Sequence, residues 1–164
     1  MSIQTIAVLG AGQMGSGIAQ IAAASGYNVI IRDIKQEFCD KGVNGIKAGL
    51  DKQVAKGKTT QEAADAIMSR ITTTVELEGV APADFVIEAA PEILSLKHDT
   101  FVQLGEICKP DAILCTNTSS MSIGEITKDC KNPERCAGMH FFFPVYAMKL
   151  VEMIRSCYTS DATV

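Results

Sequence analysis

The chain has 164 residues, of which 47% are hydrophobic and 21% charged, with 13 glycines and 5 prolines. These values are typical of a globular chain long enough for one domain, and they exclude a disordered, collagen-like or disulfide-scaffold protein. Fifteen basic and nineteen acidic side chains give a net charge of -4 without a basic stripe, so no nucleic-acid partner is expected.

The first charged side chain is Arg32, but glycines and glutamines interrupt the segment before it. We therefore expect neither a membrane span nor a signal peptide, which leaves a cytoplasmic location as the expectation. Six cysteines occur without a C-x-x-C pair, and only two histidines accompany them. This spacing predicts reduced thiols and no metal site.

In chain order, the pattern of apolar residues first predicts a strand-helix-strand unit over residues 6–9, 16–25 and 29–31. A unit of about 30 residues is typical of a crossover between parallel strands. A long helix is predicted from Ile34 onward, because Phe38, Ile46, Leu50 and Val54 recur at multiples of four. Lysines occupy its other face.

Thr59 and Glu62 have the spacing of a capping box, which predicts that another helix opens there and runs to residue 69. The remaining predicted elements are strands 71–74 and 85–88, helix 93–107, strand 112–116, helix 123–128, and strands 136–140 and 148–154. Alternation of this kind predicts an α/β fold, with an open, mostly parallel sheet and helices on both faces.

The segment Gly10-Ala11-Gly12-Gln13-Met14-Gly15 is a G-x-G-x-x-G loop between a predicted strand and a predicted helix, and Asp33 follows Gly15 by eighteen residues. This context predicts a dinucleotide site, with phosphates at the helix N-terminus and Asp33 on the adenosine ribose. An acidic residue there favours NAD over NADP, although Arg32 next to it weakens the preference. The alternative is a glycine turn without a ligand. The expected cofactor-binding residues of the loop are Gly10, Gly12, Gln13, Met14 and Gly15.

Two further segments carry polar side chains that are candidates for catalysis. His140 stands at the end of an apolar strand, and Glu152 follows on the next strand. Asn117-Thr118-Ser119-Ser120 follows a buried strand, at the edge of the sheet where open α/β folds bind ligands. The alternatives are a core histidine beside a surface carboxylate, and an ordinary turn.

At these residues the sequence resembles the 3-hydroxyacyl-CoA dehydrogenase family, in particular its bacterial 3-hydroxybutyryl-CoA members. The similar segments follow one another in order and spacing along the whole chain, and they are Val8-Leu9-Gly10-Ala11-Gly12, Val86-Ile87-Glu88-Ala89, Asn117-Thr118-Ser119-Ser120, Gly138-Met139-His140-Phe141-Phe142 and Met148-Lys149-Leu150-Val151-Glu152. The resemblance implies a Rossmann-type NAD-binding domain over residues 1–164, with a helical hairpin insertion.

The resemblance also implies the reaction, which interconverts a (3S)-3-hydroxyacyl-CoA and the 3-ketoacyl-CoA with NAD in fatty acid or butanoate metabolism. His140 matches the catalytic base, Glu152 the carboxylate that orients it, and Ser119 a residue that hydrogen-bonds the reacting oxygen of the substrate. Asn117 matches a residue that supports this loop beside the cofactor.

Three further matches concern ligand binding, since Glu92 and Lys97 align with cofactor contacts and Lys56 with a lysine near the CoA tail. The chain departs from the family at Phe143, where other members have an asparagine. It also has no counterpart of their helical C-terminal domain, which covers the substrate and forms the dimer. The chain is therefore expected to be a cofactor-binding half, completed by that domain or by forming a homo-oligomer.

Two alternative functions remain open from the sequence. A nucleotide-sensing or interaction module without catalysis would explain Phe143 and the short length, but the pair of His140 and Glu152 argues against it. A dehydrogenase of free β-hydroxyacids is the other alternative, and the Asn-Thr-Ser-Ser segment fits it poorly.

Overall fold

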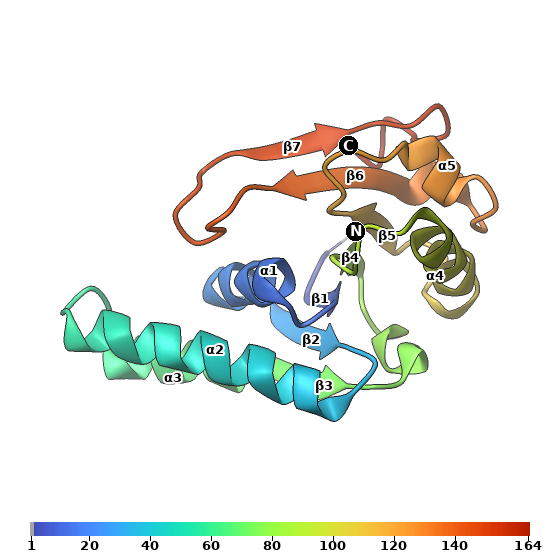
Figure 1. Cartoon of the computed structure of the whole chain (residues 1–164). Coiled ribbons are helices and arrows are strands. Elements are labelled where there is room, and N and C mark those ends of the chain that lie inside the picture. Colours follow the sequence, from blue (N-terminus) through green and yellow to red (C-terminus); the bar gives the residue numbers. More distant parts are fainter. Residues whose placement is uncertain (1) are drawn as a thin grey trace.

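A single sheet organises residues 2–164, the part of the chain that the computed structural model describes (Figure 1). Its strand order is β3-β2-β1-β4-β5-β6-β7, and every neighbouring pair is parallel except β6 and β7. The predicted open, mostly parallel sheet is therefore confirmed. The strands are β1 (Thr5–Leu9), β2 (Asn28–Arg32), β3 (Ile71–Thr74), β4 (Phe85–Glu88), β5 (Ile113–Thr116), β6 (Cys136–Phe141) and β7 (Val151–Ile154).

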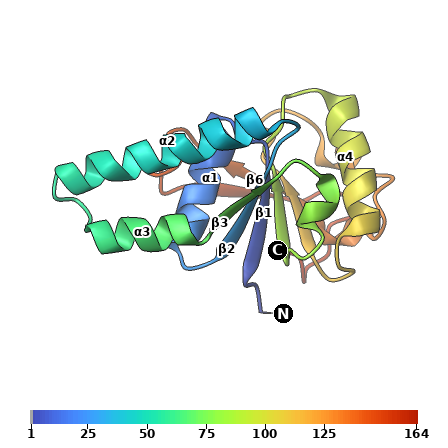
Figure 2. The same ribbon diagram turned by 90° about the horizontal axis from the view of Figure 1, so that it is seen from below.

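Helices cover both faces of this sheet, as the alternation of elements predicted. The long helix α2 and α3 form an antiparallel hairpin that extends past the sheet, as Figures 1 and 2 show, and this is the expected helical insertion. The α-helices are α1 (Gln13–Ala24), α2 (Gln36–Ala55), α3 (Gln61–Ser69), α4 (Leu94–Ile107) and α5 (Ile123–Thr127), and the short 3-10 helices are η1 (Leu77–Val80) and η2 (Pro133–Arg135).

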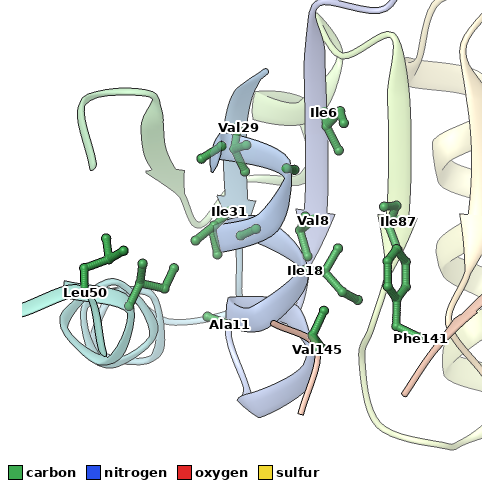
Figure 3. Packing of buried hydrophobic residues seen from close by; sticks show 14 of the residues in the cluster. Ile6, Val8, Ala11, Ile18, Val29, Ile31, Leu50, Ile87, Phe141 and Val145 are labelled. Carbon is green, nitrogen blue, oxygen red and sulfur yellow. The ribbon is translucent and has the colours of Figure 1, made fainter. Parts of the chain in front are cut away.

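Two hydrophobic clusters fix these layers, because successive residues of a strand point to opposite faces. On β1, Ile6 and Val8 pack on the side of α1, whereas Ala7 and Leu9 pack with α4 and α5. Figure 3 shows Val8, Ile18, Ile87, Phe141 and Val145 gathered between α1 and the sheet. Because strands β1 to β6 are parallel, their carboxyl ends lie at one edge of the sheet, and the site is built on this edge.

The side chain of Val145, in the loop after β6, packs closely against Gly17 of α1. A Cβ atom added to Gly17 would come within 2.9 Å of the Val145 side chain. Val145 is itself buried. The connection between β6 and β7 therefore lies across α1 near the carboxyl edge of the sheet.

Several predicted boundaries are wrong. Helix α1 begins at Gln13, three residues before its predicted start, because the glycine turn leads directly into helical backbone. Helix α3 is capped by Thr60, whose side chain accepts a hydrogen bond from the Ala63 amide, and not by Thr59. Strand β7 begins at Val151 and not at residue 148.

The predicted apolar face of α2 packs against the core from Ile46 to Val54, but not at its N-terminal end. Ile46 and Leu50 are buried in the core, whereas Ile34 is 67% exposed and Phe38 39% exposed. These two side chains line a cavity at the sheet edge, so their spacing reflects a cavity wall and not core packing. Within residues 2–164, no helix has the length and apolar character needed to cross a membrane.

Candidate active site

The turn between β1 and α1 has a backbone that only glycine fits at two positions. Gly10 has φ +99°, in the left-handed region, and an added Cβ would lie 2.6 Å from the Ala89 carbonyl oxygen. An added Cβ at Gly15 would lie 1.8 Å from the Gly10 carbonyl oxygen. The turn therefore folds back closely on the start of its own helix.

Gly12 is different, because a Cβ added there would meet no atom within 4 Å. It is the N-cap of α1, and it has no side chain with which to cap the helix. The amides of Gln13, Met14 and Gly15 in the first turn have no acceptor within the helix. Such a helix start, with open space in front of it and the positive end of the helix dipole behind it, suits a phosphate group.

Asp33 follows the end of β2 and braces the glycine turn. Its Oδ2 accepts the Ala11 amide at 2.7 Å, and its Oδ1 accepts the Ile34 amide at 2.7 Å. A carboxylate has about four lone-pair sites, so two remain for hydroxyl donors. Asp33 also lines a cavity at the carboxyl edge of the sheet. Arg32 lines the same cavity, and its Nε donates to the Val75 carbonyl at 3.2 Å.

A cavity of about 600 Å³ lies at the carboxyl edge of the sheet, between the glycine turn and the segment after β4. Its lining is mostly apolar, with a few polar groups, which is typical of cofactor sites. It brings together seven of the nine predicted cofactor-binding residues, namely Gly10, Gly12, Gln13, Met14, Asp33, Glu92 and Asn117.

His140 and Glu152 form a hydrogen-bonded pair across the antiparallel strands β6 and β7. The register places the two residues directly opposite each other, and His140 Nδ1 lies 2.8 Å from Glu152 Oε2. When Nδ1 donates to this carboxylate, the lone pair of Nε2 is free to accept a proton. The imidazole also packs on the Phe142 ring, with the ring centres 4.5 Å apart. This geometry would suit an oriented general base.

Asn117 joins three strand ends near this pair. Its backbone N–H donates to the Glu88 carbonyl at 2.7 Å, and its side-chain oxygen accepts the Phe141 backbone amide at 2.9 Å. Ser119 lies two residues further along the same turn, is exposed, and does not line the 600 Å³ cavity. The turn after β5 therefore has one side chain at the cavity and one beside it.

Four predicted ligand-binding residues do not line the cavity, and they are Gly15, Ser119, Lys97 and Lys56. Lys97 is only 1% exposed, and its ammonium contacts Glu88 Oε1 at 2.8 Å, Glu92 Oε1 at 3.3 Å and the Ala90 carbonyl at 3.1 Å. It therefore supports the cavity wall from behind. Lys56 is exposed at the C-cap of α2.

A second cavity, of about 330 Å³, lies beside the helical hairpin, and the lysine that lines it is Lys58 and not Lys56. Its other walls come from α1 and from Tyr146 of the connection between β6 and β7. The loop that follows His140 and β6 thus contributes Tyr146 to the wall of this second cavity.

Buried thiols close to the site remain protonated at neutral pH. Burial raises the pKa of Cys39, which lies behind Asp33, and raises the pKa of Cys115 in β5 to about 12. A thiol with a raised pKa contributes neither a charge nor a nucleophile to the site.

Sequence reasoning missed the polar side chains beneath the cavity wall, which are Glu88, Thr116 and Thr118. Glu88 is fully buried, and its carboxylate accepts the Ala90 amide at 2.6 Å, Thr116 Oγ1 at 2.7 Å and both contacts from Lys97. A carboxylate at the end of an otherwise apolar strand was the available signal, because a buried charge requires partners.

Comparison with known proteins places this geometry in a family context. Residues 5–164 match the family model described as 3-hydroxyacyl-CoA dehydrogenase, NAD binding domain. The chain is 44% identical over its whole length to the 3-hydroxyadipyl-CoA dehydrogenase of Escherichia coli K12, of which it covers 34%. It is 43% identical over 158 residues to the 3-hydroxybutyryl-CoA dehydrogenase of Clostridioides difficile, which aligns with 96% of this chain over 56% of its own length.

Solved structures of related dehydrogenases also match almost the whole of this chain. The chain superimposes with a TM-score of 0.97 on the 3-hydroxybutyryl-CoA dehydrogenase of Escherichia coli K12, at 44% identity, covering 99% of this chain and 34% of that one. For the (S)-3-hydroxybutyryl-CoA dehydrogenase PaaH1 of Ralstonia eutropha, the TM-score is 0.96 at 40% identity, covering 99% and 57%. The chain therefore spans between about a third and just over half the length of these relatives.

Proposed function

The chain belongs to the family of 3-hydroxyacyl-CoA dehydrogenase NAD-binding domains, and from this premise we propose that it is the cofactor-binding half of an NAD-dependent 3-hydroxyacyl-CoA dehydrogenase. The proposed substrate is a short-chain (3S)-3-hydroxyacyl-CoA such as 3-hydroxybutyryl-CoA. The observation that carries the proposal is the His140–Glu152 pair, 2.8 Å apart, on the same sheet edge as the cofactor cavity.

The residues present fit the cofactor of this family. The glycine turn would hold the diphosphate, because the Gly12 cap leaves open space in front of the first-turn amides of α1. Asp33 would accept the adenosine ribose hydroxyls with the lone pairs that Ala11 and Ile34 leave free, and its charge would disfavour a 2′-phosphate. NAD supplies a hydride acceptor and, once reduced, a hydride donor.

His140 would move the proton of the reaction. In the oxidation direction, its Nε2 takes the proton from the C3 hydroxyl while the hydride leaves C3, so that the alcohol becomes the ketone. Glu152 fixes the tautomer through Nδ1 and stabilises the imidazolium that results. Ser119, on the neighbouring turn, would donate a hydrogen bond to the reacting oxygen. Lys56 is proposed for the anionic CoA tail.

An exposed apolar surface near His140 supports the idea that this half works together with a second domain or a second copy. Four large side chains of the connection between β6 and β7 are more than 40% exposed, and they are Phe143, Tyr146, Met148 and Leu150. Several large apolar side chains exposed along one segment are typical of an interface. A covering domain would also exclude water from the reacting atoms, which raises the rate of hydride transfer.

The test is reduction of acetoacetyl-CoA by NADH, followed by the absorbance of NADH, in the complete dehydrogenase and in the 164-residue chain with and without the C-terminal domain of a relative. We expect turnover with the domain and little without it. The His140→Ala variant should bind NADH normally and lose turnover. Normal turnover by this variant would contradict the proposed role of His140, and NADH binding without turnover in every combination would instead favour a sensing module.

A further inference from the structure

Five residues at and beneath the cavity wall form a closed ring of polar contacts, which we name the polar ring. Lys97 contacts Glu88 at 2.8 Å and Glu92 at 3.3 Å. Thr118 Oγ1 donates to Glu92 Oε2 at 2.5 Å, and the Thr118 amide donates to Thr116 Oγ1 at 3.3 Å. Thr116 Oγ1 donates to Glu88 Oε2 at 2.7 Å, which closes the ring.

Only one member of the polar ring reaches the cofactor cavity. Glu88, Lys97, Thr116 and Thr118 are at most 3% exposed, whereas the Glu92 side chain is 47% exposed and lines the cavity. A ligand that contacts Glu92 therefore acts on a side chain whose partners in the polar ring, Lys97 and Thr118, are both buried. Buried hydrogen bonds are geometrically demanding, because an unpaired group in the interior is costly.

Thr118 connects the polar ring to the turn after β5. Thr118 Oγ1 accepts the amides of Met121 at 3.2 Å and of Ser120 at 3.5 Å, while it donates its own proton to Glu92. One hydroxyl group thus fixes the turn around Ser119 and ties that turn to Glu92. Ser119 itself is exposed, so its position depends on the backbone on either side of it.

We propose that Thr118 is a positioning residue that couples the Glu92 wall of the cofactor cavity to the turn carrying Ser119. The consequence for Ser119 rests on the proposed function, in which this side chain orients the substrate. Glu92, held by Lys97, sets the direction of the Thr118 hydroxyl, and the hydroxyl sets the turn. A cofactor bound against Glu92 would thereby influence the position of Ser119 through the Thr118 hydroxyl, separately from any contact with Asn117 at the start of the same turn.

The first test needs no ligand and uses the amide signals of Ser119, Ser120 and Met121 in the ¹⁵N-labelled chain. Glu92→Gln should shift these signals, although no hydrogen bond joins Glu92 to them directly. In the Thr118→Val background the same substitution should leave them in place, and Thr118→Ser, which retains the hydroxyl, should restore the response. Controls are Glu62→Gln, at an exposed position on α3, and Thr72→Val, which removes a hydroxyl from β3.

The second test measures NADH affinity by fluorescence in the same variants. Thr118 does not line the cavity, so Thr118→Val should weaken binding only through Glu92, by roughly threefold to tenfold, the equivalent of one hydrogen bond. In the Glu92→Gln background, Thr118→Val should change the affinity less than twofold, or about 0.4 kcal/mol. The double-mutant cycle thus separates coupling from a local effect on the turn.

The outcomes distinguish this inference from the proposed function. Unmoved signals in Glu92→Gln, an equal response with and without the Thr118 hydroxyl, or additive losses of affinity would each overturn the coupling. Failure of the unaltered chain to bind NADH would instead overturn the proposed function, and the amide signals would still decide the coupling. If Thr118→Val does not fold, the single Glu92→Gln variant retains the power to refute it.

Discussion

Replacing Lys97 by methionine is the perturbation that most sharply tests how the cavity wall is held. The ammonium of Lys97 contacts Glu88 at 2.8 and 3.0 Å, and neither side chain is exposed to solvent. Methionine has a similar length and no charge. The substitution therefore leaves the Glu88 carboxylate in the interior with its charge uncompensated.

The magnitude follows from the burial of the pair. Removing one partner of a buried ion pair costs about 3–5 kcal/mol, because the remaining charge is desolvated. Domains of this size unfold with about 5–15 kcal/mol, so Lys97→Met should remove a large part of the stability. The corresponding fall in the midpoint of thermal unfolding is roughly 6–20 °C. The double variant Glu88→Gln with Lys97→Met should regain part of the loss, since no buried charge remains unpaired.

The assay is urea unfolding of the chain without ligand, followed by circular dichroism, with thermal unfolding as a second measurement. The matched control is Lys47→Met, because Lys47 pairs with Asp51 at 2.9 Å on the exposed surface of α2. This control should change the free energy of unfolding by less than about 0.5 kcal/mol. A loss below about 1 kcal/mol for Lys97→Met, or a double variant less stable than the single one, would refute the reasoning.

Three other predictions concern the glycine turn, the proposed catalytic pair of His140 and Glu152, and the response to pH. Gly12→Ala should have the same free energy of unfolding as the unaltered chain, because the added Cβ would occupy only the space in front of the helix. The same variant should bind NADH at least tenfold more weakly in a fluorescence titration. Gly15→Ala should lose stability as well, since its Cβ would lie 1.8 Å from the Gly10 carbonyl oxygen. In the chain supplemented with the C-terminal domain of a relative, Glu152→Gln should lower kcat for acetoacetyl-CoA by roughly 10²-fold with little change in KM, and an unchanged kcat would contradict its proposed role. Hydrogen bonds from Lys109 and from two backbone amides lower the pKa of Asp84 from 3.8 to about 2. Its stabilisation is therefore present above pH 4 and lost as pH falls toward 2, so Asp84→Asn should cost about 1 kcal/mol at pH 7 and almost nothing at pH 2, as urea unfolding at each pH will measure.

Most of the sheet could be predicted from the sequence, because a parallel strand buried on both faces is a short apolar run with a sharp end. Strands β3 and β4 begin and end at the predicted residues. The start of α1 could not be placed in the same way, since Gly12 caps the helix without a side chain and so gives no capping signal. At α3, two adjacent threonines competed, and only the structure shows that Thr60 makes the cap.

The glycine turn was predictable because its residues are close in sequence and their backbone requirements are local. The 2.8 Å contact of His140 with Glu152 depends on the antiparallel register of β6 and β7, which the sequence did not specify. Phe38 was misplaced because a spacing of four residues is the same for a core contact and for a cavity wall.

The polar ring could not be predicted, because its contacts join residues up to 28 positions apart. The resemblance identified Lys97 as a cofactor contact, whereas the structure places its ammonium behind the wall, on Glu88 and Glu92. Sequence similarity reveals that a position matters to a site, but not whether the side chain acts on the ligand or on another side chain.

The central claim is tested most directly by a crystal structure of the chain grown with NADH. The diphosphate should lie in front of the Gly12 cap, within hydrogen-bond distance of the first-turn amides of α1, with the adenosine ribose on Asp33 and the nicotinamide facing the edge that carries His140. Clear density for NADH at another location, or a glycine turn that remains free of ligand at saturating NADH, would contradict it.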